Sequence, residues 1–191
     1  MVQNKLVLYP IDTHFHVDHL PSFIDALRQI GFVGELFTQR KRGGYLVGDN
    51  FFSLVTFLGC LPFVPIEPKN DEEFCYIDIL PIQKEAQFLA SNRLKEVRCP
   101  KCRYEEKAWQ HVVEQWNKDK TDFSYTCPQC GHSTSIERLN WKRKAAITCW
   151  AIEIHGIYES EALPNDLLLD TLKQQTNVVW DYFYQSEDKK A

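Results

Sequence analysis

Several motifs that accompany common enzymatic chemistries are missing from this chain. It has no P-loop, no glycine pattern for a dinucleotide and no G-x-S-x-G elbow of a serine hydrolase. A long hydrophobic run is missing too: the longest, from Phe51 to Val64, contains Gly59, Cys60 and Pro62. A helix needs about 20 apolar residues to cross a bilayer. The sequence therefore indicates no nucleotide chemistry, no serine nucleophile and no membrane span.

A secretory leader is also missing from the first residues. Met1 to Lys5 lead directly into a short apolar run, without the pattern of a signal peptide. The chain has 7 cysteines, which in a secreted protein would suggest disulfides, but four of them have the spacing of metal ligands. We therefore expect a reducing, cytoplasmic location. Cys60, Cys75 and Cys149 have apolar neighbours and are expected to be buried, inert thiols.

Two short cysteine pairs carry the strongest chemical signal. Cys99 and Cys102, and then Cys127 and Cys130, each form a C-P-x-C knuckle. A tetrahedral metal ion needs four converging ligands, and two C-x-x-C turns that face each other supply them. The alternative is a redox dithiol, which requires one pair at a helix start in a βαβ context. Because there are two pairs, we predict one metal site with all four thiolates.

These knuckles resemble the zinc-ribbon superfamily over residues 97–141, and the chain is similar to bacterial proteins that carry such a ribbon. The resemblance implies two paired hairpins that hold one zinc ion through the same four cysteines. Sites of this kind leave no open position for a substrate water, so the zinc would be structural. The chain departs from the pattern at Arg103, where glycine is typical, and in its long linker. His132 is predicted to be a non-ligand.

The charge of the chain is uneven although no sign dominates it. The formal net charge is −4, but residues 93–144 hold 12 Lys and Arg against 7 Asp and Glu, a surplus of +5. A zinc ion with four thiolates would reduce that surplus to about +3. The asymmetry permits an acidic partner without requiring one.

Hydrophobic periodicity predicts an α+β fold. The expected helices begin near Ser22, at Asp49 or Asn50, at Glu105 and at Leu163. The expected strands cover residues 6–17, 74–82, 145–158 and 178–184.

The order of these elements suggests how the chain is divided. The elements before the cysteine segment follow β-α-(α)-β, and those after it follow β-α-β. This is the order of a ferredoxin-like split βαβ sheet with a zinc ribbon inserted between its halves. We therefore expect residues 1–92 and 145–185 to form one α+β domain. Residues 93–144 would be the inserted zinc-ribbon module, and residues 186–191 a flexible tail.

A histidine run is the second candidate site. Residues 11–19 read I-D-T-H-F-H-V-D-H, which resembles the first metal motif of the metallo-β-lactamase superfamily and the opening of TatD-type hydrolases. In a strand, side chains two residues apart point to the same face, as a metal pair must. The resemblance implies a small metal-dependent hydrolase with four site residues: His14, His16, Asp18 and His19.

The rest of either hydrolase pattern is missing from the chain. His155, near Glu153, could join the run if the sheet pairs those strands. The alternative is a surface strand whose histidines have Asp12 or Asp18 as hydrogen-bond partners and no metal.

Basic and aromatic residues interleave in the cysteine segment. Such a face could contact phosphates and stack bases, and its members are Lys101, Arg103, Trp109, Lys142, Arg143 and Lys144. Alternatively, Trp109 and Trp116 pack the linker helix onto the sheet, and the basic run is solvated. We expect a non-catalytic binding or scaffolding protein with a protein or nucleic-acid partner. The metal-dependent hydrolase is the alternative, and self-association through the aromatic strand at residues 180–184 is a third hypothesis.

Overall fold

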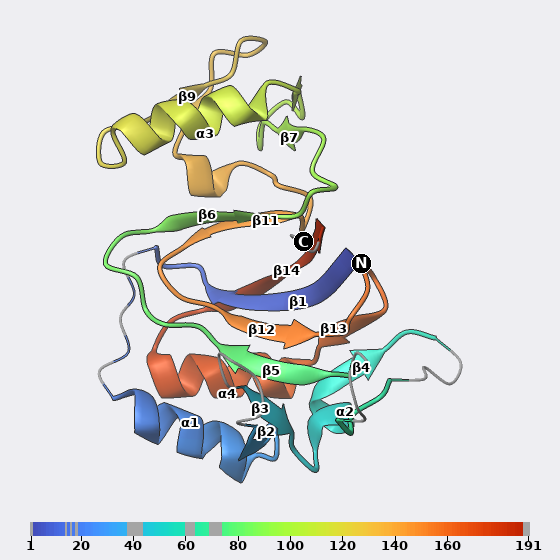
Figure 1. Cartoon of the computed structure of the whole chain (residues 1–191). Helices are drawn as coiled ribbons and strands as arrows, with labels where there is room; N and C mark the ends of the chain where they lie inside the picture. The colour runs from blue at the N-terminus through green and yellow to red at the C-terminus, as the bar shows by residue number, and fades with distance from the viewer. Residues whose placement is uncertain are drawn as a thin grey trace.

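A six-stranded sheet forms the body of the molecule (Figure 1). The computed structural model describes residues 2–13, 15, 17, 19–37, 44–59, 64–68 and 74–188. The sheet has the strand order β14-β1-β12-β5-β3-β2, and all neighbouring strands are antiparallel. Its strands are β1 (Val2–Pro10), β2 (Val33–Leu36), β3 (Tyr45–Val47), β5 (Tyr76–Ile79), β12 (Ile152–His155) and β14 (Trp180–Asp188). The mixed α and β composition agrees with the sequence prediction.

In two places in this sheet, two strands run parallel to each other with one antiparallel strand between them. β12 and β14 both run antiparallel to β1, which lies between them, and α4 (Asp166–Thr176) connects them along the chain. β1 and β5 both run antiparallel to β12, and α1 (Leu20–Gln29) lies between them in the sequence. Each unit is therefore a strand–helix–strand crossover that is split by an antiparallel strand.

The helices α1 and α4 each begin with a side-chain cap. The Nδ1 atom of His19 accepts a hydrogen bond from the Ser22 N–H at 3.2 Å, so the cap of α1 is His19 and not Ser22, which the sequence predicted. α1 ends at Gln29, and Gly31, the residue after its C-cap Ile30, has a left-handed φ of +74°. The Asn165 side chain caps α4 in the same way, two residues after the predicted start at Leu163.

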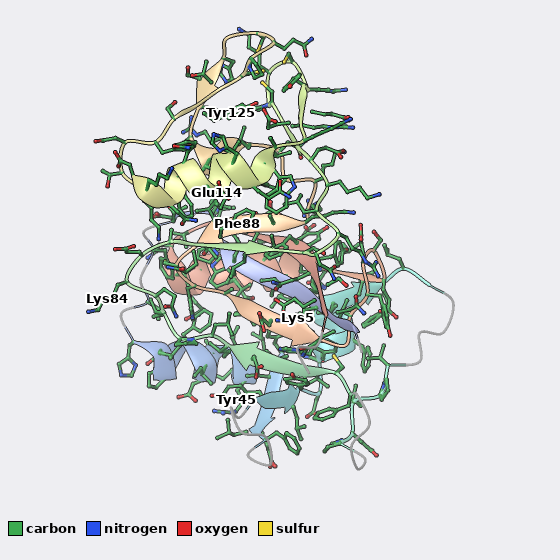
Figure 2. All side chains as sticks on the ribbon, turned by 45° about the horizontal axis from the view of Figure 1, so that its top comes forward. Lys5, Tyr45, Lys84, Phe88, Glu114 and Tyr125 are labelled. Atoms are coloured by element: carbon green, nitrogen blue, oxygen red, sulfur yellow. The ribbon has the colours of Figure 1, made fainter. Side chains whose placement is uncertain are left out.

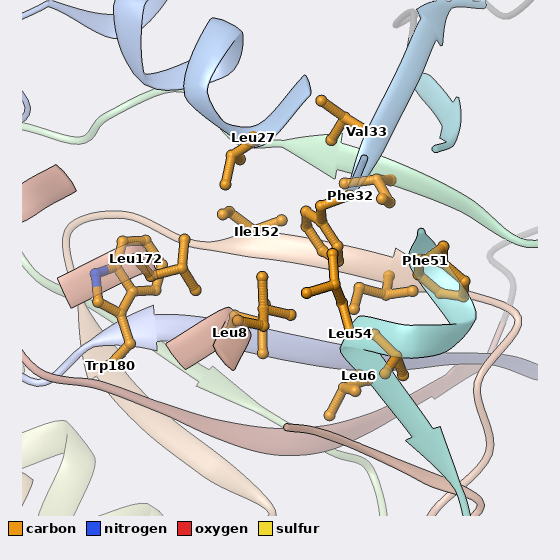
Figure 3. Packing of buried hydrophobic residues seen from close by; sticks show 14 of the residues in the cluster. Leu6, Leu8, Leu27, Phe32, Val33, Phe51, Leu54, Ile152, Leu172 and Trp180 are labelled. Atoms are coloured by element: carbon orange, nitrogen blue, oxygen red, sulfur yellow. The ribbon is translucent and has the colours of Figure 1, made fainter. Parts of the chain in front are cut away.

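One apolar core fills the space between the sheet and these helices (Figure 3). β1 alternates, so that Leu6 and Leu8 face the helices while Val7 belongs to a separate cluster on the opposite face. Phe23 of α1 packs against Trp150 and Trp180, with ring centroids 4.9 and 6.2 Å apart. Both faces of the central strands are therefore covered.

The helix predicted to begin at residue 49 or 50 is present but ends after four residues. α2 covers only Phe51–Leu54, and β4 (Val55–Phe57) follows it at once and pairs with β13 (Ala162–Pro164). Val55 and Thr56 are β-branched and fit a strand better than a helix. The prediction was wrong here because the apolar spacing suited either structure.

The long strand predicted over residues 145–158 is two strands in different sheets. β11 (Ala145–Thr148) pairs with β6 (Gln87–Ala90), whereas β12 pairs with β1 and β5. Between them, the Thr148 hydroxyl donates to the Trp150 carbonyl at 2.8 Å and accepts from the Trp150 N–H at 3.2 Å. This local bonding competes with the ladder and redirects the chain.

Three strand boundaries also differ from the prediction. β1 ends at Pro10, which has no N–H to donate, rather than at residue 17. β5 spans residues 76–79 and is shorter than expected. β14 continues to Asp188, beyond the predicted start of a flexible tail, and pairs there with Val2. The two described ends of the chain therefore lie side by side (Figure 1).

The segment between β5 and β12 forms a module at the top of Figure 1. The ribbon of β6 and β11 leads into it. Its elements are β7 (Val97–Arg98), β8 (Glu105–Glu106), α3 (Trp109–Lys118), β9 (Tyr125–Thr126), β10 (Ser133–Thr134) and the 3-10 helix η1 (Ile136–Arg138). The linker helix begins at Trp109 and not at Glu105, because residues 105–106 pair with residues 97–98.

The module has a hydrophobic core of its own. Val97, Val113, Trp116 and Ile136 are among its buried members. Phe88 of β6 lies between α3 and the sheet (Figure 2) and packs against this core. No helix in the described part of the chain combines the length and apolar character that crossing a membrane requires.

Candidate metal centre

The first cysteine pair lies at the tip of the hairpin β7–β8. The Cys99 N–H donates to the Tyr104 carbonyl at 3.0 Å, and the Arg103 N–H donates to the Cys99 carbonyl at 3.0 Å. Arg103 has a φ of +63°, in the left-handed region. The chain therefore makes a tight turn that presents both sulfurs on one side.

The second pair repeats this turn at the tip of β9–β10. The Cys127 N–H donates to the His132 carbonyl at 2.9 Å, and the Gly131 N–H donates to the Cys127 carbonyl at 2.9 Å. Gly131 has a φ of +66° and occupies the position of Arg103. The two knuckles share one backbone design even though the first lacks the glycine of the second.

The four sulfur atoms converge between the two hairpins. The Sγ atoms of Cys99 and Cys130 are 3.8 Å apart, and those of Cys102 and Cys127 are 3.6 Å apart. All four lie within 4.8 Å of one another. Sulfur ligands at about 2.3 Å from a tetrahedral ion are about 3.8 Å apart. The four predicted ligands therefore fit one metal ion.

The thiols also have the electrostatics of a metal site. Backbone hydrogen bonding from Cys102 lowers the pKa of Cys99 to about 7. The Tyr104 backbone favours the thiolate of Cys102, but burial and the neighbouring sulfurs raise its pKa to about 12. Four thiolates this close repel one another unless a cation compensates their charge. His132, predicted to be a non-ligand, is not part of the ligand group.

The aromatic residues of the cysteine segment differ in accessibility. Trp116, Tyr125 and Trp141 are buried in the core of the module. Trp109 is half-buried, and its ring lies 5.8 Å from that of Phe88. These contacts agree with the alternative that the tryptophans pack the module.

The basic run after Trp141 links the module to the body. Arg143 Nη1 lies 3.0 Å from Asp181 Oδ1 of β14, and its guanidinium lies 3.9 Å from the ring centroid of Tyr182. Lys144 lies 3.2 Å from Glu159. Exposed pairs of this kind contribute little individually, but together with the Arg143–Tyr182 stacking they connect two elements that are far apart in sequence.

The turn that carries this run has two consecutive left-handed residues. Lys142 and Arg143 both have a φ of +54°, and the Lys144 N–H donates to the Trp141 carbonyl at 3.0 Å. Two positive φ angles in a tight turn normally call for Asn or Gly. Lys142 also pairs with Glu96, so ion pairs hold a turn that its residue types disfavour.

A cleft opens beside this turn, where the module meets the body. Its volume is about 660 Å³, which is within the usual range for ligand sites. Arg138, Lys142 and Arg143 line it, but so do Asp12 and Asp181. The lining therefore has charges of both signs.

Three of the four candidate site residues in the histidine run lie outside the described residues, namely His14, His16 and Asp18. His19 is exposed and caps α1. His155 pairs with Lys5 in the middle of β1, before the run begins. The strand pairing therefore places His155 beside Lys5 and not, as the sequence analysis had suggested, beside the histidine run.

The sheet brings His155 together with other residues instead. Its Nε2 atom lies 3.1 Å from Asp78 Oδ2 and 3.1 Å from Glu153 Oε2, and Lys5 Nζ lies 3.0 Å from Glu153 Oε1. Burial favours the neutral form of Glu153, but the adjacent His155 and the charge of Lys5 outweigh it and lower its pKa. The sequence analysis paired His155 with Glu153 but missed Lys5 and Asp78. The signal it overlooked was polar residues at alternate positions of three apolar strands.

Comparison of the chain with protein-family models, with curated proteins and with solved structures gave no match. The site is therefore interpreted from its own geometry.

Proposed function

We propose that this protein is a non-catalytic binding protein whose module is stabilised by one structural zinc ion. The observation that supports zinc is the convergence of four sulfurs at tetrahedral spacing, because thiolates select soft or borderline ions. With four protein ligands the ion has no position for a substrate. The zinc would hold together the two hairpins β7–β8 and β9–β10, whose strands are only two residues long.

The partner we propose is a nucleic acid, bound at the first knuckle. Lys101, Arg103 and Lys107 are exposed there, and none forms an ion pair with a residue that the structure describes. Tyr104, which follows Arg103 in the turn, is half-buried. Free cations next to an aromatic ring suit a phosphate backbone and unpaired bases. The run at residues 142–144, in contrast, has carboxylate partners.

Binding of a labelled single-stranded oligonucleotide to the zinc-loaded protein tests this proposal. We expect an affinity that falls steeply between about 50 and 200 mM salt. Lys101→Glu/Arg103→Glu/Lys107→Glu should weaken binding at least tenfold. The matched control reverses three exposed cations of the body, Arg28→Glu/Lys84→Glu/Lys173→Glu, and should bind like the parent. Equal losses in both variants, or no binding by the parent, would reject the nucleic acid and leave a protein partner.

We also infer that the body is a ferredoxin-like sheet. The strand order β14-β1-β12-β5, with two split crossovers and helices α1 and α4 on one face, supports this assignment. The metal-dependent hydrolase at His14, His16, Asp18 and His19 stays a prediction, which metal content of a His14→Ala/His16→Ala variant tests.

A further inference from the structure

A buried polar group interrupts the apolar sheet on the face opposite α1 and α4. Lys5 lies in the middle of the sheet (Figure 2), on the same face of β1 as Val7. Glu153 and His155 of β12 and Asp78 of β5 lie beside it. Polar side chains at such positions cost free energy unless their contacts compensate.

The imidazole of His155 is the unsatisfied member of this group. His155 is 4% exposed, and its Nε2 atom has no hydrogen-bond partner of acceptable geometry among the described residues. Two carboxylate oxygens nevertheless lie 3.1 Å from it, those of Asp78 and Glu153. A single N–H cannot point at both oxygens. Two ligands at right angles, each about 2.1 Å from a metal ion, are about 3.0 Å apart, so the spacing suits a shared cation.

The charges of the group point the same way. The ammonium of Lys5 lies 3.0 Å from Glu153 and 3.6 Å from Glu187, and Asp78 adds a third carboxylate, 3.1 Å from the imidazole of His155. Among the described residues, these three carboxylates therefore outnumber the one ammonium beside them. Lys5 contacts Oε1 of Glu153, which leaves Oε2 for another partner. A divalent cation would neutralise the group.

The ring of His155 is held in one orientation. It stacks on Tyr76 with centroids 4.1 Å apart and planes 8° from parallel. The Gln3 side-chain amide lies 2.7 Å from its Nδ1 atom and 3.5 Å from the Tyr76 hydroxyl. The amide nitrogen is the atom that lies there. Turned by 180°, the amide would place its oxygen at Nδ1, accept a hydrogen bond from the Nδ1–H and leave Nε2 free as a ligand, the usual arrangement around a metal-bound histidine.

The space around Asp78 is also shaped for its carboxylate. A Cβ atom on Gly44, the residue before β3, would lie 2.7 Å from Asp78 Oδ1, so a larger residue there would displace the carboxylate from its present position. The Asp78 side chain is 22% exposed. The group is therefore open to solvent at Asp78 alone among its three candidate ligands, which allows a path for an ion and its water ligands.

We propose that Asp78 Oδ2, Glu153 Oε2 and His155 Nε2 bind one divalent transition-metal ion. Two carboxylates and one imidazole are a harder ligand set than four thiolates and suit Mn²⁺, Fe²⁺ or Zn²⁺. This site is separate from the cysteine site, which lies in the module, and it adds a second metal to the function proposed above.

A Mn²⁺ titration of the zinc-loaded protein tests the proposal, because Mn²⁺ has little affinity for thiolates. The electron paramagnetic resonance signal of free Mn²⁺ reports how much has bound, and elemental analysis of the same samples gives total metal. We expect two divalent ions per chain in the parent, whether the second is Mn²⁺ or zinc already present. Asp78→Asn and His155→Ala should retain one ion, with Mn²⁺ affinity at least tenfold weaker.

Two controls keep the result interpretable. His111→Ala removes an exposed histidine of α3 and should bind both ions like the parent. Zinc content of one per chain confirms that a variant has folded its module. The melting temperature of the parent, with no variant involved, should also rise with Mn²⁺ concentration. One ion per chain in the parent at all Mn²⁺ concentrations, or undiminished binding by both variants, would overturn the proposal.

Discussion

At the scale of single residues, the two knuckles make the same turn with different residues. Arg103 and Gly131 both have a left-handed φ, which costs a non-glycine residue about 1 kcal/mol or more. The four cysteines could be predicted from the sequence because a metal site fixes their spacing locally. The sequence shows that the first knuckle lacks the glycine of the second. It does not show that Arg103 adopts a left-handed backbone conformation there.

We therefore predict that glycine stabilises the first knuckle. Arg103→Gly should raise the free energy of unfolding by about 0.5–1 kcal/mol relative to Arg103→Ala, since both remove the charge and only glycine relieves the backbone. Gly131→Ala should lower it by about 1 kcal/mol, because nothing lies within 4 Å of the added Cβ atom and only the backbone is affected. Thermal unfolding of the zinc-loaded variants measures both. An Ala variant as stable as Gly at position 103 would contradict this account.

The ion pair of Lys5 and Glu153 gives a pH-dependent prediction. The pKa of Glu153 is lowered in the folded state, so its contribution to stability is present above the unfolded pKa of about 4.3 and is lost as the pH falls through the lower folded pKa. Glu153→Gln leaves Lys5 buried beside a neutral partner and should destabilise by about 3 kcal/mol at neutral pH.

Urea unfolding of the parent and of Glu153→Gln at several pH values provides the measurement. The difference between the two should shrink as the pH falls below about 4.3 and vanish below the lowered folded pKa, where Glu153 is protonated in both states of the parent. Loss of the cysteine site in acid affects both proteins equally. If the difference in the free energy of unfolding between the two proteins stays constant with pH, the charge of the Glu153 carboxylate does not stabilise the fold.

At the scale of elements, strand ends were harder to predict than helix starts. The start of α4 at Asn165 follows from a cap and a periodic face that are local in sequence. The break between β11 and β12 depends on pairing with β6, β1 and β5, which lie far away in the chain. Because the strands on both sides of the break are buried, their residues form one continuous apolar run in the sequence.

Thr148 should be essential to that break. Thr148→Val keeps the shape of the side chain but removes both hydrogen bonds to the Trp150 backbone, which is buried, and should cost about 1–3 kcal/mol. Thr171→Val is the matched control: its hydroxyl bonds to Leu167 within α4 at an exposed position, and its loss should cost well under 1 kcal/mol. Denaturant unfolding compares the two, and similar costs would argue against a special role for Thr148.

At the scale of the whole molecule, two cores share one chain. The core of the body joins the sheet to α1, α2 and α4, and the core of the module surrounds α3 and the cysteines. The sequence predicted an inserted module from the cysteine spacing. It did not predict β2, β3 or β6, because these short strands are defined by long-range partners rather than by their own periodicity.

Removal of the metal should therefore affect the two cores differently. Chelation should abolish amide protection in residues 97–134, where each hairpin strand is only two residues long. The protection of β1 and β12 should be unchanged. Hydrogen exchange followed by mass spectrometry measures both regions in one sample. Equal loss across the sheet would mean that the body does not fold independently of the metal.

The zinc site itself is tested most directly by X-ray absorption at the zinc edge, using the His155→Ala variant so that the second proposed site does not contribute. We predict one zinc per chain with four sulfur ligands at about 2.3 Å, and loss of that zinc in Cys127→Ala. A chain without zinc, or a zinc with nitrogen or oxygen in its ligand shell, would contradict the account.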